Sequence, residues 1–258
     1  MTADRNHPAD QNHPADKGGQ RSPGHPVEMM EVLKIGGSLS RSPALPDLCQ
    51  EISRLGAHHH LLVVPGGGEF ADLVRDFYAD LQLSETAAHR MAILAMDQYG
   101  HLLGDLIPDA ELVIDLKAVL RVATSGRVPI LLPSSLMNQL DPLPHSWQVT
   151  SDSIAAWVAG ALGAPYLILL KDVDGLYDSD PNSAASRELL TQIELAKLTH
   201  LAGGVDQYLA TVLAQNEVET WVINGRNPDR LVELFEKGQT LGTCILRKLI
   251  RGGKTIIS

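Results

Sequence analysis

Short apolar runs alternate along this chain with longer segments in which apolar positions recur every three or four residues. The short runs predict buried β-strands, and the longer segments predict amphipathic helices. The expected strands are 31–35, 60–65, 111–115, 128–133, 166–172 and 219–225. The expected helices are 45–56, 69–81, 84–107, 151–163, 206–216 and 228–238, with one more short helix between residues 115 and 128.

This order of elements predicts an α/β fold with a mainly parallel central sheet. Strands that alternate with helices usually pair in parallel, and the helices then cover both faces of the sheet. In such sheets, ligands bind outside the carboxyl ends of the strands. The residues that directly follow the predicted strands are therefore the candidates for a functional site.

The first 27 residues differ from the rest of the chain. The sequence NHPAD occurs at 6–10 and again at 12–16, and few residues nearby are apolar enough to be buried. We predict a flexible tail for 1–27 and a single domain for 28–258. The histidines of the tail lack the spacing of a metal site, so a solvated tail is the simpler interpretation.

The composition narrows the classes of function. The 258 residues are 44% hydrophobic but only 4% aromatic, which indicates a substantial aliphatic core. A net charge of −10 argues against a nucleic-acid partner, which requires a basic surface, but leaves room for a nucleotide pocket. Cys49 and Cys244 form no disulfide framework, and no membrane helix or signal peptide is evident. We therefore expect a cytoplasmic protein without a membrane partner.

Two predicted strands end in glycine-rich turns. Lys34 is the last residue but one of the first strand, which Gly36, Gly37 and Ser38 follow, while Gly66, Gly67 and Gly68 follow the second strand. Glycines let backbone amides approach an anion closely, and a lysine supplies positive charge. One such turn is equally consistent with ordinary backbone packing. Two of them on neighbouring strands favour two anion sites that face one crevice.

Two later segments supply acidic groups and a second lysine. Asp152 lies at the expected start of helix 151–163, where it either caps the helix or orients lysines around a phosphoryl group. The segment 169–181 follows a buried strand and contains Lys171 and several acidic side chains. An acidic loop beside phosphates requires a cation, so Lys171 or Mg²⁺ is implied. Because the loop lacks the final Glu of an EF-hand, we assign no residue as a dedicated metal ligand.

The ordered set LKIGGS, VPGGGEFA, SDSIAAWVA, KDVDGLYDSDP and the closing VING…GTCI resembles the amino acid kinase superfamily over residues 30–247. This resemblance implies a three-layer αβα sandwich with an acceptor lobe at about 28–165 and a nucleotide lobe at about 166–258. It also implies ATP-dependent phosphoryl transfer to a small molecule, with ATP and Mg²⁺ as cofactors and a homodimer as the assembly.

The resemblance assigns roles to the matching positions. Lys34, Asp152 and Lys171 are implied to be catalytic, with Lys34 neutralising the transferred phosphoryl group and Asp152 organising the lysines. The implied nucleotide-binding residues are Gly36, Gly37, Ser38, Asp172, Asp174, Gly175, Tyr177, Asp180 and Pro181. The implied acceptor-binding residues are Gly66, Gly67, Gly68 and Gln148.

One position departs from the family pattern. Several members carry a second lysine after a late glycine turn, whereas the segment LAGGVDQYLA at 201–210 has Asp206 and no lysine. Lys171 is the candidate to replace it. Because that lysine is absent, a non-catalytic nucleotide-binding or storage module remains an alternative.

The segment AAHRMAILAMDQYGHLLGDL at 87–106 is similar to the family branch that acts in methanofuran biosynthesis. That branch converts an aminomethylfuran phosphate to its diphosphate, so the resemblance implies this acceptor. UMP, an amino acid and an isoprenoid phosphate remain alternative acceptors. His89, Asp97, Gln98 and His101 occur in this segment at helical spacing, where they either meet an acceptor amine or face solvent or a dimer partner.

Overall fold

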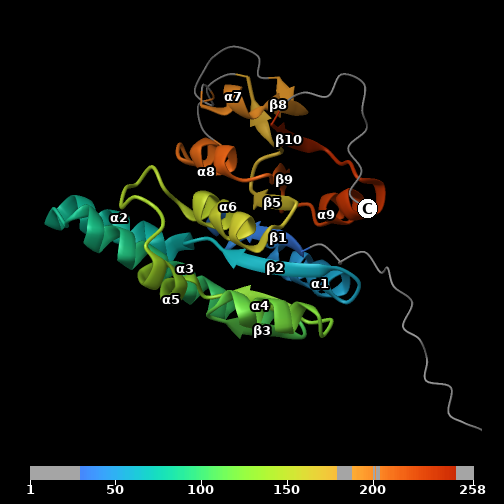
Figure 1. The fold of residues 1–258 in the computed structure, drawn as a ribbon, viewed down its shortest axis with the longest axis horizontal. Coiled ribbons are helices and arrows are strands. Elements are labelled where there is room, and N and C mark those ends of the chain that lie inside the picture. The colour runs from blue at the N-terminus through green and yellow to red at the C-terminus, as the bar shows by residue number, and fades with distance from the viewer. Residues whose placement is uncertain (1–29, 179–187, 200, 202–203, 248–258) are drawn as a thin grey trace, which may run out of the picture.

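A computed structural model of the chain describes residues 30–178, 188–199, 201 and 204–247. Its centre is an eight-stranded sheet with helices packed on both faces (Figure 1). The predicted tail at 1–27 lies outside the described residues, as do the candidate residues Asp180 and Pro181.

The strands of the central sheet follow the order β3-β4-β2-β1-β5-β9-β10-β8. All neighbouring strands pair in parallel except β9 and β10, which are antiparallel. A separate two-stranded hairpin pairs β6 with β7. The bounds of the strands are β1 Met30–Ile35, β2 His60–Pro65, β3 Ala110–Val113, β4 Val128–Leu131, β5 Tyr166–Lys171, β6 Leu176–Tyr177, β7 Leu189–Leu190, β8 Gln192–Glu194, β9 Glu219–Asn224 and β10 Gly242–Leu246.

The helices form the two outer layers. One layer contains α4, α6 and α8, and the other contains α1 and α9, while α3 contributes side chains to both cores. The short 3-10 helix η1 follows β1. The bounds of the helices are η1 Gly37–Leu39, α1 Leu45–Gly56, α2 Gly68–Leu81, α3 Glu85–Leu106, α4 Leu116–Ala123, α5 Pro133–Leu140, α6 Ser151–Leu162, α7 Leu195–Leu198, α8 Leu209–Gln215 and α9 Asp229–Lys237.

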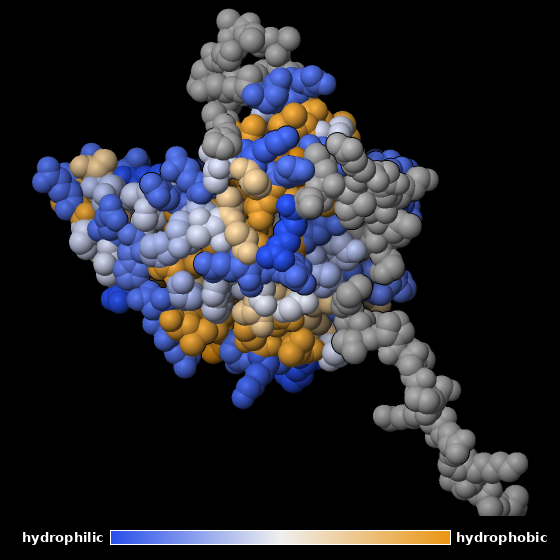
Figure 2. All heavy atoms as spheres, turned by 45° about the horizontal axis from the view of Figure 1, so that its top comes forward, coloured by the Kyte–Doolittle hydropathy of each residue, from blue (hydrophilic) through white to orange (hydrophobic). Residues whose placement is uncertain are grey.

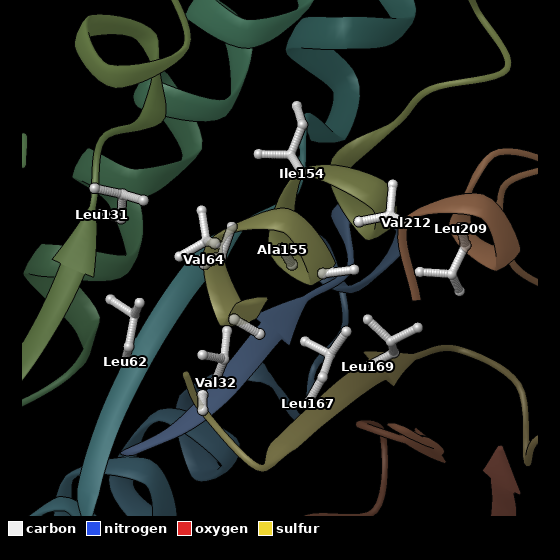
Figure 3. Close-up of a cluster of buried hydrophobic side chains, with 14 of the residues drawn as sticks. Val32, Leu62, Val64, Leu131, Ile154, Ala155, Leu167, Leu169, Leu209 and Val212 are labelled. Carbon is white, nitrogen blue, oxygen red and sulfur yellow. The ribbon is translucent and has the colours of Figure 1, made fainter. Parts of the chain in front are cut away.

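The alternation of side chains along β1 explains how one strand serves both cores. Val32 packs in the core under α6, whereas Leu33 and Ile35 pack in the core under α1 and α9. Figure 3 shows Val32 beside side chains of β2 and β5, with Ile154 and Ala155 of α6 packed over them. Lys34 is two residues from Val32, so its side chain leaves the sheet on the α6 side.

The structure confirms the expected α/β sandwich and most of its elements. The first strand and the helix at 45–56 lie where the apolar pattern predicts them, and Ser84 caps α3 by accepting a hydrogen bond of 3.2 Å from the Ala87 amide. The structure differs from the prediction at the ends of some elements, where a turn residue such as proline sets the boundary. Strand β4 ends at Leu131, because Pro133 begins a helix, α5, that the apolar pattern did not predict.

Three short strands, one short helix and the last strand were also not expected. The hairpin β6–β7, the edge strand β8 and helix α7 are too short to show a period in the sequence. Strand β10 was recognised only as part of the GTCI motif. Helix α8 begins at Leu209 instead of residue 206, with Tyr208 as its N-cap residue. Asp206 lies in the turn before the helix, where its Oδ1 accepts a hydrogen bond of 2.8 Å from the Leu209 amide.

The face of the molecule drawn in Figure 2 is mixed in polarity. Figure 2 shows hydrophilic residues over much of one face, with separate apolar patches between them. Within the described ranges, no helix is both long enough and apolar enough to cross a membrane.

Glu31 is a polar exception inside the core under α1. Its side chain is only 4% exposed, and within the described part of the chain Oε2 has no hydrogen-bond partner. Burial raises the pKa of Glu31 from 4.5 to about 7, against the smaller opposing effect of a hydrogen bond with its own backbone. The folded chain therefore keeps a proton that the unfolded chain releases between these two pH values.

We predict that Glu31→Gln removes a pH dependence of stability. Wild-type stability should fall as the pH rises from 4.5 to about 7, because only the unfolded chain releases the proton in this range. Urea unfolding of both proteins at pH 5 and pH 8 measures the effect. The free energy of unfolding of the variant minus that of the wild type should be about 1–3 kcal/mol larger at pH 8 than at pH 5. A difference that is the same at both pH values would contradict this account of Glu31.

Candidate active site

Two lysines lie on neighbouring strands and point to the same side of the sheet. Lys34 belongs to β1 and pairs in register with Leu169 of β5. Lys171 is the last residue of β5, two positions after Leu169, so both lysine side chains leave the sheet on the α6 side. The strand pattern thus places both cations at the carboxyl edge, where ligands of parallel sheets bind.

The carboxylate of Asp152 lies between the two lysines. Asp152 Oδ1 is 2.8 Å from Lys34 Nζ, and Oδ2 accepts a hydrogen bond of 2.6 Å from Lys171 Nζ. The side chains of Asp152 and Lys34 are 2% and 5% exposed, whereas that of Lys171 is 16% exposed. These three residues, which we call the Lys–Asp–Lys triad, form a buried cluster with a net charge of one positive unit when both lysines are protonated.

Burial and charge act against each other within the triad. Burial raises the pKa of Asp152, but the ammonium groups of Lys171 and Lys34 outweigh this effect and hold that pKa well below its usual value. Burial also lowers the pKa of Lys34, and the charge of Lys171 adds to this, while the Asp152 carboxylate opposes both. Asp152 is therefore ionised at pH 7, supports the charge of Lys34, and is not a general base.

Helix α6 can present Asp152 to the lysines because other residues cap its start. Thr150 is the N-cap residue. The Asp206 carboxylate accepts hydrogen bonds of 2.5–2.9 Å from the amides and hydroxyls of Thr150 and Ser153. The Asp206 amide donates to Asp152 Oδ2 at 3.3 Å. The alternative that Asp152 is simply a helix cap therefore does not hold, and Asp206 fixes the start of α6, which carries Asp152.

A cavity of about 670 Å³ contains the triad. Its wall combines both glycine turns and the start of α6 with parts of α2 and α3. Next to β5 the wall includes Ser38 and Asp172, whose side chains share a hydrogen bond of 2.9 Å. Arg226 also approaches Asp172, with 3.5 Å between Nη2 and Oδ2. The structure thus brings these two nucleotide candidates together beside the lysines.

The two glycine turns contact each other as well as the cavity. A Cβ atom on Gly37 would lie 2.2 Å from the amide nitrogen of Gly68, and one on Gly66 would lie 2.5 Å from the amide nitrogen of Gly37. No side chain fits at either contact. Backbone packing, the simpler of the two sequence interpretations, is therefore part of the reason for these glycines.

The backbone amides of the turns are not all available to a ligand. The Gly36 amide donates to the Leu170 carbonyl, and the Gly66 amide donates to the Ile35 carbonyl, each at 2.8 Å. Gly66 does not line the cavity. The candidate glycines on the cavity wall are Gly36, Gly37, Gly67 and Gly68.

Three other nucleotide candidates do not line this cavity. Asp174 accepts a hydrogen bond of 2.6 Å from Arg230 Nη1, which ties its loop to α9. A Cβ atom on Gly175 would lie 2.6 Å from Thr243 Oγ1, so this glycine permits close packing against β10. Tyr177 belongs to the β6–β7 hairpin. Their contacts indicate that Asp174 and Gly175 shape the loop rather than touch the triad.

The acceptor candidate Gln148 also lies apart from this cavity. It is exposed and lines a second cavity of about 780 Å³ next to α8. Trp147 and Thr150 line both cavities, so their segment forms a wall between Gln148 and the triad.

The end of the triad cavity next to α2 and α3 includes residues that the sequence patterns did not identify. Arg75 lies over the ring of Trp147, with 5.2 Å between the guanidinium carbon and the ring centroid. Ile93 and Met96 add apolar surface. A sequence signal for Arg75 existed, because it lies two helical turns after Gly68 on the same face of α2. Trp147 lies in an irregular segment without periodicity.

The polar residues singled out on α3 separate into two groups. His89 lines the triad cavity. Asp97 accepts a hydrogen bond of 3.1 Å from the Ser134 amide at the start of α5 and thereby joins two helices. Gln98 and His101 are exposed and do not line the cavity.

The chain is similar to known proteins in both sequence and fold. A model of the amino acid kinase family matches residues 29–224. The (5-(aminomethyl)furan-3-yl)methyl phosphate kinase of Methanocaldococcus jannaschii is 32% identical over 224 residues, which cover 84% of this chain and 98% of that protein. A uridylate kinase of Methanosarcina barkeri is 27% identical and covers 81% of this chain and 92% of its own length.

Solved structures share the fold. The uridylate kinase of Archaeoglobus fulgidus superimposes with a TM-score of 0.67 at 23% identity, covering 84% of this chain and 99% of that chain. An isopentenyl phosphate kinase of T. acidophilum, in a product complex, reaches a TM-score of 0.57 at 20% identity, with 84% and 99% coverage. These relatives are kinases of small molecules, which makes this chain an ATP-dependent small-molecule kinase. The match over most of the chain shows that the chain belongs to the amino acid kinase family.

Proposed function

We propose that this kinase transfers the γ-phosphoryl group of ATP to the phosphate of a small acceptor, namely (5-(aminomethyl)furan-3-yl)methyl phosphate, and forms its diphosphate. The 32% identical relative that carries this activity in its name supports the acceptor. The observation that carries the reaction type is the Lys–Asp–Lys triad in the wall of the 670 Å³ cavity.

The triad suits an acceptor that is already an anion. A phosphate monoester has a second pKa of about 6 and is largely a dianion at pH 7, so it attacks without losing a proton to the protein. Asp152, which the two lysines hold in its ionised form, could not accept such a proton in any case. A hydroxyl acceptor would require a base that this cluster does not supply. The triad therefore favours phosphate or carboxylate acceptors over alcohols.

The proposed transfer is an in-line displacement. An oxygen of the acceptor phosphate forms a bond to the γ-phosphorus of ATP, and the bond from that phosphorus to the β–γ bridging oxygen breaks. ADP leaves with the electron pair and the negative charge. Lys34 and Lys171 would stabilise the charge on the transferred group, and Asp152 would hold them in place.

We assign the nucleotide to the end of the cavity next to β5, the first strand of the proposed nucleotide lobe at about 166–258. Gly36, Gly37, Ser38 and Asp172 line this end. Among residues 30–178, 188–199, 201 and 204–247, no group of three or more acidic, His or Cys side chains forms a ready-made metal site. Mg²⁺ typically takes one or two carboxylates together with nucleotide phosphates, and Asp172 fits that role. When bound, Mg²⁺ neutralises phosphate charge.

We assign the acceptor to the opposite end of the cavity, within the lobe at about 28–165. At this end, Gly67 and Gly68 supply backbone groups and Arg75 of α2 supplies a cation. Trp147 adds a flat apolar surface. We place the reaction in the cytoplasm, where ATP is available; the unbridged, buried thiols of Cys49 and Cys244 are consistent with that setting.

An acceptor panel tests the proposed function. The protein is incubated with ATP, Mg²⁺ and, separately, the aminomethylfuran phosphate, UMP, isopentenyl phosphate or N-acetylglutamate. We expect ADP release that depends on the furan phosphate, with a new diphosphate detected by mass spectrometry. Faster transfer to another compound of the panel would show that this compound, and not the furan phosphate, is the acceptor. ATP binding without transfer to any acceptor would favour the non-catalytic alternative.

We predict that Lys34→Met lowers kcat by about 10²–10³-fold, because one cation next to the transferred group is lost. Lys171 still pairs with Asp152 in this variant, so the fold should be retained. Lys117→Met, at an exposed position on α4, is the matched control and should keep wild-type kcat. Turnover of Lys34→Met within a few-fold of the wild type would show that Lys34 does not act on the transferred group.

We also propose that the kinase is a homodimer that uses one face of α2. Phe70, Leu73, Phe77 and Leu81 are exposed at helical spacing along this face. Figure 1 shows α2 at the far left of the molecule, extending beyond the helices that cover the sheet. A second copy that packs the same face in a two-fold symmetric contact would bury this apolar stripe.

We predict that Phe77→Glu converts the dimer to a monomer, because it places a charge inside the proposed contact. Leu120→Glu introduces the same charge at an exposed leucine of α4 and serves as the control. Light scattering after size-exclusion chromatography measures the mass of each protein. The assignment fails if the wild type is a monomer or if Phe77→Glu remains a dimer.

A further inference from the structure

His89 presents an imidazole to the acceptor end of the triad cavity. It lies on α3, half-buried, in the same cavity wall as Arg75 and Trp147. It is one of the four polar residues of segment 87–106, for which the sequence leaves an acceptor amine, solvent and a dimer partner as alternatives. Its position at the end away from Asp172 makes it a group that can contact the part of the acceptor that does not react.

A second histidine holds the ring of His89. The rings of His89 and His145 stack with 4.6 Å between centroids and an interplanar angle of 23°. His145 is itself fixed at both nitrogens, because Nε2 lies 2.7 Å from Asp141 Oδ1 and Nδ1 lies 3.0 Å from Thr86 Oγ1. The stack therefore covers one face of the His89 ring and leaves its edge to make hydrogen bonds.

The surroundings keep His89 uncharged near neutral pH. Burial lowers the pKa of His89, and the charges of His145 and Arg90 act in the same direction, while Asp141 opposes them. A neutral imidazole carries one nitrogen that donates a hydrogen bond and one that accepts. His89 can thus accept a hydrogen bond from a cationic group without adding a positive charge of its own.

The other charged groups at this end are already paired. Arg75 Nη1 lies 2.6 Å from Asp72 Oδ1, and Arg41 forms an ion pair with Glu69. All four line the cavity together with His89. An acceptor amine would therefore have to compete with an arginine for either carboxylate. Neither arginine pairs with the ring of His89, so its edge remains open to the amine.

We propose that His89 accepts a hydrogen bond from the protonated amine of the acceptor and so selects a phosphate that carries an amine over one that does not. His145 acts as a positioning residue, since it holds the ring through the stack. The inference rests on the proposed function, because it concerns the acceptor of that same reaction. Of the four polar residues of segment 87–106, it makes His89 the one that determines acceptor specificity, because the other three do not line the cavity.

The test compares two acceptors that differ only in the amine. One is (5-(aminomethyl)furan-3-yl)methyl phosphate, and the other is the same compound with a methyl group in place of the aminomethyl group. The measured quantity is the ratio of their kcat/KM values, in which the titration of the shared phosphate cancels. For the wild type we expect a ratio of about ten to a hundred at pH 8, as for a hydrogen bond to a charged group. The ratio should fall as the pH drops below 6.5, because protonated His89 repels the amine.

Three variants complete the experiment. His89→Leu should bring the ratio close to one at all pH values, and His89→Gln should restore part of it without pH dependence, because its carbonyl accepts a hydrogen bond but does not titrate. His101→Leu makes the same substitution at an exposed position of α3 and should match the wild type. Thermal unfolding of each variant reports whether the fold is intact.

The outcomes separate this inference from the proposed function. If the wild type phosphorylates the aminated acceptor but His89→Leu slows both acceptors equally, the inference is overturned and the proposed function stands. If His89→Leu loses the ratio but His89→Gln restores none of it, hydrogen bonding by His89 is also overturned. A wild type that forms product from neither furan compound overturns both.

Discussion

The buried carboxylate of Asp152 is the constraint on which the site depends. An ionised carboxylate that is 2% exposed would cost several kcal/mol if it had no partner, so the fold requires a cation beside it, and Lys34 and Lys171 both fill that role. Each lysine comes from a different strand, and the carboxylate comes from a helix above them. One cluster therefore joins β1, β5 and α6 and also fixes the geometry of two cations in the cavity wall.

This constraint also restricts the chemistry. A carboxylate that two ammonium groups hold ionised can orient and neutralise, but it cannot remove a proton. Transfer to an acceptor that is already anionic needs only positioning and charge stabilisation. The glycine turns contribute by bringing β1 and the start of α2 so close together that no side chain intervenes at Gly37. The same turns that pack the two backbones against each other therefore form part of the cavity wall.

Much of this fold could be predicted from the sequence, because strands and helices of ordinary length carry a clear apolar period. The triad residues were also predicted, because Lys34 and Lys171 lie at the ends of predicted strands, Asp152 begins an Ala-rich helix, and the family resemblance links all three. The hairpin β6–β7 was not, because two-residue strands have no period. The His89–His145 stack was not either, because it joins residues whose contact only the folded chain creates. The glycine pattern also could not show which backbone amides are free to bind an anion. The Gly36 amide, for example, already donates a hydrogen bond to the Leu170 carbonyl.

The most direct test of the central claim is a crystal structure of the kinase with Mg²⁺, ADP, aluminium fluoride and the furan phosphate acceptor. The metal fluoride replaces the phosphoryl group in transit between ADP and the acceptor. Our account predicts that the ammonium groups of Lys34 and Lys171 both lie within hydrogen-bond distance of the fluoride ligands, while Asp152 still contacts both lysines. A complex in which the fluoride binds away from the triad, with neither lysine in contact, would contradict it.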